Sequence, residues 1–144
     1  MESNEQKTNV HYVDAIRSLI NHESEVTNNR MIWMAAFHGL LFTALGFAWD
    51  KPNTKLLITV FCLLGIAVAI LNTIALINSS VATRRLLIWW DENKPYDYDG
   101  PDVIGLAPKN PRSLLYLIAP WNILALIFGF GWAAILLINL GRPQ

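Results

Sequence analysis

The chain has 144 residues and a formal net charge of zero, and 53% of its residues are hydrophobic whereas only 15% are charged. A soluble domain normally carries about 25% charged residues, so this composition argues against a soluble protein. The zero net charge and the absence of a basic tract argue against nucleic-acid binding. The apolar residues are concentrated in three blocks without Lys, Arg, Asp or Glu, at residues 31–49, 56–77 and 114–140.

The first predicted element is an amphipathic helix over residues 8–30. Val10, Val13, Ile16 and Ile20 recur there at three- and four-residue steps, which is the period of one helical face. No apolar segment with a small-residue cleavage site precedes the first block, so we expect no signal peptide and expect the first span to direct insertion. The helix is therefore expected to lie outside the lipid and to continue into the first span.

Each of the three apolar blocks is long enough to cross a bilayer, because about 20 residues at 1.5 Å each span a hydrocarbon core of about 30 Å. Between the first two blocks, residues 50–55 form a short turn with Pro52 and Asn53, which predicts a tight helical hairpin. In the alternative, the three helices form the core of a globular fold, and too few residues remain to cover them. The prediction is an all-α membrane protein with three transmembrane helices in a single membrane domain, residues 1–144.

The second span is expected to continue as a helix to about residue 93, because residues 78–93 contain no Pro or Gly and Pro95 follows. A Pro-rich loop over residues 94–113 then leads to the third span. The cytoplasmic extensions of the first two spans should pack as an antiparallel pair. Glu23 on the first extension lies at about the same height as Arg84 and Arg85 on the second, which predicts an ion pair between them.

The distribution of Lys and Arg predicts the orientation of the chain. With three spans, the N-terminus and the second loop share one side, which holds eight of these residues, and the other side holds three. Positively charged residues are enriched on the cytoplasmic side, so the N-terminus should be cytoplasmic and the C-terminus outside. Counting only residues near the span ends narrows the split to five against three.

Four polar residues lie at similar depths in the predicted spans: His38, Asn72, Thr73 and Asn122. One interpretation is interhelical hydrogen bonding, with a neutral His38 bonded to Asn72 or Asn122 and a contribution of about 0.6–2 kcal/mol. The other is a pore-lining or proton-linked role, since ionisable residues inside a membrane are candidates for function. No Asp or Glu lies in any block, which favours the structural interpretation.

Small residues recur every four positions in each span, a pattern that lets helix backbones approach closely. The three ladders are Ala35, Gly39 and Thr43; Gly65, Ala69 and Thr73; and Ala125, Gly129 and Ala133. Three helices can use two ladders internally and leave the third for another copy of the chain. A homo-oligomer is therefore expected.

The sequence offers no strong catalytic or metal site and no cofactor motif. Val26 stands where the second His of an H-E-x-x-H zinc motif beginning at His22 would be needed. Arg17 and His22 match an R-x4-H pattern that resembles the HEPN ribonuclease motif, so a membrane-bound nuclease is the remaining enzymatic alternative. We expect a non-enzymatic protein without a cofactor.

The polar helix HESEVTNNRMIW (residues 22–33) runs into a first span, and the third span carries the dipeptide Pro120-Trp121. This arrangement is similar to small multi-pass bacterial membrane proteins of unassigned function. It also resembles compact transmembrane effectors of bacterial defence systems, in which a cytosolic sensor triggers membrane permeabilisation. The resemblance implies the bacterial inner membrane and a cytosolic protein partner. The leading hypothesis is an oligomeric pore or permeabilising effector, and the alternative is an accessory or scaffold subunit that regulates a larger membrane complex through its cytoplasmic helices.

Overall fold

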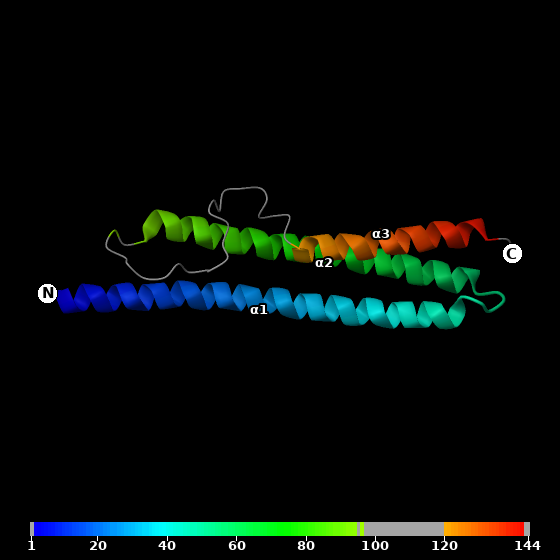
Figure 1. Cartoon of the computed structure of the whole chain (residues 1–144), viewed down its shortest axis with the longest axis horizontal. Helices are drawn as coiled ribbons and strands as arrows, with labels where there is room; N and C mark the ends of the chain where they lie inside the picture. The colour runs from blue at the N-terminus through cyan, green and yellow to red at the C-terminus, as the bar shows by residue number, and fades with distance from the viewer. Residues whose placement is uncertain (1, 95, 97–119, 143–144) are drawn as a thin grey trace.

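The computed structural model describes residues 2–94, 96 and 120–142, with side chains described from residue 13 onward. This part of the chain contains three helices, α1 (Glu2–Ala48), α2 (Lys55–Asn93) and α3 (Pro120–Gly141), and no strand. The helices lie side by side in an elongated bundle in which α2 runs antiparallel to the other two (Figure 1). Each helix contains a stretch that is long and apolar enough to cross a membrane. The all-helical fold with three such helices is confirmed.

The hairpin between α1 and α2 is closed by one hydroxyl group. The Oγ1 of Thr54 donates to the carbonyl oxygens of Ala48 at 2.8 Å and Lys51 at 2.7 Å. Asn53 has a φ of 62°, a left-handed conformation that Asn adopts more readily than most side chains. Pro52 and Asn53 therefore suit the chain reversal. At the other end of α2, Lys94 has an extended backbone before Pro95, as the restriction on a residue preceding proline requires.

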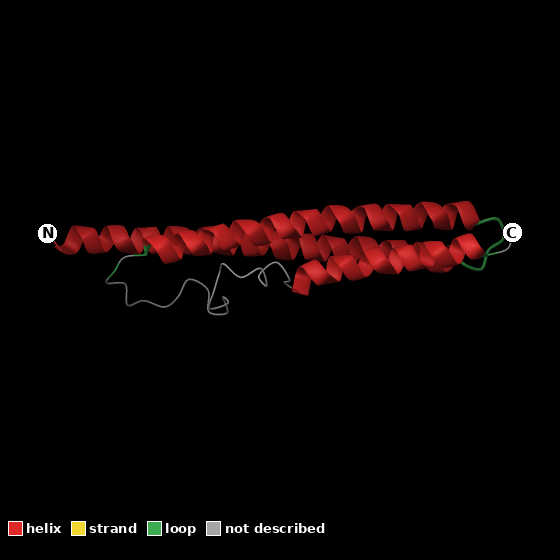
Figure 2. Ribbon diagram, turned by 90° about the horizontal axis from the view of Figure 1, so that it is seen from above, coloured by secondary structure: helices red, strands yellow, loops and turns green. Residues whose placement is uncertain are grey.

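Beyond the level where α3 begins, α1 and α2 continue together as a two-helix unit that we call the stalk, residues 2–26 and 81–93 (Figure 2). Val13, Ile16 and Ile20 of α1 are buried there against Leu87 and Trp90 of α2. The amphipathic helix predicted over residues 8–30 and the first apolar block thus belong to one continuous helix, α1. The predicted loop over residues 94–113 and the start of the third span at residues 114–119 lie outside the described residues, apart from Lys94 and Tyr96.

Large apolar side chains cover the outside of the three-helix part of the bundle. Leu40 and Phe47 of α1, Leu71 of α2 and Phe130 and Leu137 of α3 are each at least 66% exposed. A water-soluble protein rarely exposes so continuous an apolar surface. In a bilayer the same surface contacts acyl chains, which agrees with helices that span the membrane.

Candidate functional site

His38 is completely buried at the centre of the three-helix part of the bundle. Its Nδ1 accepts a hydrogen bond from the indole Nε1 of Trp132 on α3 at 2.9 Å. Its ring stacks on Phe128 with the centroids 4.4 Å apart and the planes inclined by 10°. Because Nδ1 is the acceptor, neutral His38 carries its proton on Nε2, which has no partner among the described residues.

Trp132 reaches His38 by passing over Gly65 of α2. A Cβ placed on Gly65 would lie 2.5 Å from the Cδ2 and Cε2 atoms of the indole, so only glycine leaves room for the ring. Phe42 of α1 stacks on the indole of Trp132, with the ring centroids 4.4 Å apart. The backbones of α1 and α3 meet at few positions, and these aromatic side chains connect the two helices.

The predicted polar cluster does not form as expected. Asn72 donates to the carbonyl oxygen of Val68 at 2.9 Å, and Thr73 donates to that of Ala69 at 2.8 Å, so both bond within their own helix. Asn122 is buried on α3. The expectation that His38 pairs with Asn72 or Asn122 is wrong, because its Nδ1 accepts from the indole of Trp132 and its Nε2 has no partner among the described residues. Trp132 was not among the predicted site residues, and its position in the middle of an apolar block was the one signal that could have indicated it.

The small-residue ladders divide between the interior and the surface. Gly65 and Ala69 of α2 and Ala125 of α3 are buried, and a Cβ on Gly129 would meet the Cβ of Ala69 at 3.5 Å. Thr73, Gly129 and Ala133 are half-buried. The ladder of Ala35, Gly39 and Thr43 on α1 is exposed, and a Cβ on Gly39 would meet no atom within 4 Å. Two ladders thus serve the bundle, whereas the ladder of α1 faces outward.

A polar seam lies where the stalk joins the three-helix part. The Oγ1 of Thr27 donates to Oγ of Ser79 at 2.8 Å, and the Oγ of Ser79 donates to Oε2 of Glu23 at 2.9 Å. Trp121 of α3 donates from Nε1 to the Oγ of Ser80 at 3.1 Å. The predicted ion pair of Glu23 with Arg84 or Arg85 is wrong, because Ser79 of α2 donates a hydrogen bond to the carboxylate instead. These bonds fix the three helices in register.

The polar seam and the hairpin are separated by about the thickness of a bilayer's hydrocarbon core. Thr27 and Ala48 are separated by 21 residues of α1, or about 30 Å, and His38 lies near the midpoint. A cation caps a carbonyl near each end: Arg30 donates to the carbonyl of Ala75 at 3.1 Å, and Arg142 donates to that of Trp49 at 3.1 Å. The described geometry is that of a membrane-spanning bundle with polar ends and an aromatic centre.

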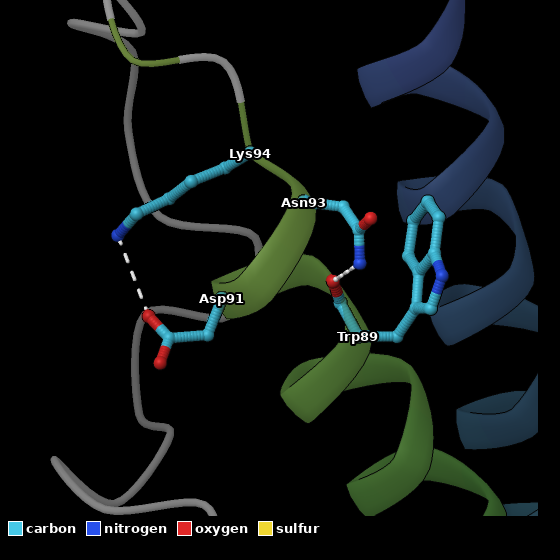
Figure 3. A network of polar contacts seen from close by, with 4 residues as sticks. All are labelled: Trp89, Asp91, Asn93 and Lys94. Carbon is cyan, nitrogen blue, oxygen red and sulfur yellow. Dashed lines mark hydrogen bonds and ion pairs between the residues drawn. The ribbon is translucent and has the colours of Figure 1, made fainter.

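In the last turn of α2, polar contacts join residues that are close in sequence (Figure 3). Lys94 and Asp91 form an ion pair at 3.5 Å, and Nδ2 of Asn93 donates to the carbonyl of Trp89 at 2.8 Å. Asp91 and Lys94 point away from α1, whereas the ring of Trp89 lies on the side of α2 that faces it. Both charged side chains are largely exposed.

Arg17 and His22, the residues of the nuclease alternative, both lie on the stalk. His22 is exposed, and Arg17 forms an ion pair with Asp14 at 4.0 Å. Among the described residues, no group of three or more His, Cys, Asp or Glu side chains could hold a metal ion. Cys62 is a buried member of the apolar cluster at the hairpin end of the bundle.

Comparisons with family models, with curated proteins and with solved structures gave no match for this chain.

Proposed function

We propose that this chain is a non-enzymatic integral membrane protein that acts as an accessory or scaffold subunit, anchored by its three spans and presenting the stalk to a cytosolic protein partner. The observation that carries the proposal is the length of the stalk. The 25 residues of α1 that precede Thr27 extend about 37 Å beyond the polar seam, and they pack on α2 over much of that distance. Such a rigid projection suits a docking role.

The surface of the stalk supports this role. Its inner face holds the buried cluster of Val13, Ile16, Ile20, Leu87 and Trp90. On its outer surface, Leu19 of α1 is 50% exposed. In the cytoplasm, exposed apolar side chains rimmed by polar residues are typical of contacts between proteins.

The second candidate is the oligomeric pore or permeabilising effector. The exposed ladder of Ala35, Gly39 and Thr43 favours it, because small residues on an outer helix face allow a second copy to approach. The interior of a single copy is filled by Trp132, Met34 and other large buried side chains. A path for ions would therefore run between copies.

Reconstitution separates the two candidates. Purified protein in liposomes with a potassium gradient should release no more potassium than protein-free liposomes if the chain is a scaffold. Release that rises with protein density and is lost in Gly39→Ile would support the pore and contradict the scaffold.

A photo-crosslinking residue then tests the docking role in native membranes. At Leu19 it should give a discrete adduct with a second kind of protein, and at Leu137, which is 70% exposed on the apolar surface, it should not. Lipid adducts alone at both positions would contradict a stalk-docking scaffold.

A further inference from the structure

A cavity of about 650 Å³ opens at the hairpin end of the bundle, between the turn that joins α1 and α2 and the end of α3. Its walls include Trp49, Lys51 and Lys55 from the hairpin, and Asn139 and Arg142 from α3. The proposed function makes no use of this cavity. Its position at the end of the apolar surface places it at the level of lipid headgroups.

The cavity is lined by more positive than negative charge. Lys51, Lys55 and Arg142 face a single carboxylate, that of Asp50, and neither ion pair found among the described residues involves any of these four. Lys55 instead donates from Nζ to the carbonyl oxygens of Leu140 at 3.3 Å and Arg142 at 2.8 Å. The cationic charge of the wall is therefore not neutralised within this part of the chain.

Lys55 and Arg142 both keep hydrogen-bond donors that a ligand could use. An ammonium has three N–H donors, and Lys55 uses two of them on carbonyls. A guanidinium has five, and Arg142 uses one on the carbonyl of Trp49 while its Cζ lies over the Trp49 ring, 4.4 Å from the centroid. The ring and the carbonyl hold the guanidinium in place without using up its donors.

The start of α2 adds a further positive element. Thr54 is the N-cap residue, but its hydroxyl bonds Ala48 and Lys51 and does not cap the helix, and the first turn contains no acidic residue. The free N–H groups of a first turn and the helix dipole favour an anion.

Asn139 provides an independent sign of a missing ligand. Its side chain is 1% exposed, and its Nδ2 donates to the carbonyl of Lys55 at 3.1 Å and to Oγ1 of Thr59 at 3.0 Å. Its Oδ1 has no partner among the described residues, although Asn139 lines the cavity. A buried oxygen without a donor is costly, and a hydroxyl or amine of a ligand would satisfy it.

We propose that this cavity binds a phosphate-bearing headgroup of an anionic membrane phospholipid, with Lys55, Arg142 and the first turn of α2 holding the phosphate. A hydroxyl of the headgroup supplies the donor for Asn139. Free inorganic phosphate offers the same oxyanion but lacks acyl chains. Leu56, which lines the cavity and is 77% exposed, gives those chains an apolar surface to follow.

The test measures thermal unfolding of the purified chain in a neutral detergent. Dioleoyl phosphatidylglycerol should raise the midpoint of unfolding, whereas dioleoyl phosphatidylcholine or inorganic phosphate at the same concentration should leave it unchanged. The double variant Lys55→Gln/Arg142→Gln should lose most of the phosphatidylglycerol effect, with apparent affinity falling at least about tenfold. Arg30→Gln is the matched control for the Arg142 change, since each removes one positive charge and a carbonyl bond of 3.1 Å, at opposite ends of the bundle.

An equal shift with phosphatidylcholine, an equal shift with inorganic phosphate, or an unchanged response in the double variant would each overturn the proposal. If the double variant does not fold, native mass spectrometry of the wild-type chain replaces it. One retained phosphatidylglycerol per chain, in preference to phosphatidylcholine supplied at equal concentration, is the expected result. Equal retention of the two lipids would refute the site.

Discussion

Trp132 and His38 lie 94 residues apart in the chain, yet the indole Nε1 of one donates to the imidazole Nδ1 of the other at 2.9 Å inside the bundle. An indole nitrogen can only donate, so this bond requires an unprotonated Nδ1. A proton added there would leave two donors facing each other. In the folded bundle the geometry therefore favours a neutral, structural His38 over a proton carrier.

Replacement of His38 tests this structural role. His38→Leu should lower stability in detergent by about 0.6–2 kcal/mol, because the buried indole loses its acceptor. His38→Gln should lose less, since a side-chain amide oxygen can accept the same bond. Denaturant unfolding followed by tryptophan fluorescence measures both.

The double variant His38→Leu/Trp132→Phe provides the control for that experiment. It should lose less stability than the sum of the single variants, because neither polar partner is left unpaired. Strict additivity would show that the bond contributes nothing. Equal potassium flux by wild type and His38→Gln across pH 5–8 would also exclude a proton-linked role for His38.

Gly65 should be the least replaceable of the intramembrane glycines. Gly65→Ala places a methyl group 2.5 Å from the rigid ring of Trp132, so we expect a loss of about 1–3 kcal/mol. Gly129→Ala gains only an ordinary 3.5 Å contact with Ala69 and should be tolerated. The midpoints of thermal unfolding in detergent should follow this order, and equal midpoints would contradict the tight Gly65–Trp132 contact.

Gly39 should matter for assembly rather than for folding. Gly39→Ile adds bulk to an exposed face, so it should leave the unfolding midpoint of the monomer nearly unchanged while it separates the copies of an oligomer. Light scattering of the detergent-solubilised protein measures the mass of the assembly. The same oligomer for wild type and Gly39→Ile would exclude this face as the contact between copies.

A substitution in the apolar cluster of the stalk should unfold the stalk locally and leave the membrane spans folded. Ile20 is 3% exposed, so Ile20→Ala should cost about 2–5 kcal/mol locally and increase cleavage of the stalk by protease. Its neighbour Leu19 is 50% exposed, so Leu19→Ala is a matched control that should be cleaved like wild type. Equal cleavage of the two variants would mean that the apolar cluster does not hold the stalk together.

The orientation of the chain remains a prediction from the distribution of Lys and Arg. Reporter fusions at residues 1, 53 and 144 should place the N-terminus in the cytoplasm and both other positions outside. A reporter active only in the cytoplasm should therefore be silent at residue 144. Activity at residue 144 would show that the orientation is the opposite one, with the cavity lined by Lys55 and Arg142 in the inner leaflet.

The sequence by itself determined the helices and their apolar character. Block length, the turn at Pro52 and Asn53, and Pro95 after α2 are local signals, and the hydrophobic effect and backbone sterics act on them without tertiary contacts. The continuation of α1 and α2 beyond the apolar blocks was also predictable, because Val13, Ile16 and Ile20 repeat with the helical period.

Only the tertiary structure decided which side chains meet. Depth along a helix placed His38 near Asn72 and Asn122, but the rotation of each helix turned Trp132 toward His38, and Asn72 bonds its own helix. Height also placed Glu23 beside Arg84 and Arg85, yet its carboxylate accepts a hydrogen bond from Ser79. A residue's height follows from a rise of 1.5 Å, whereas its direction depends on how the helices pack, and here the Trp132 ring lying over Gly65 sets that packing.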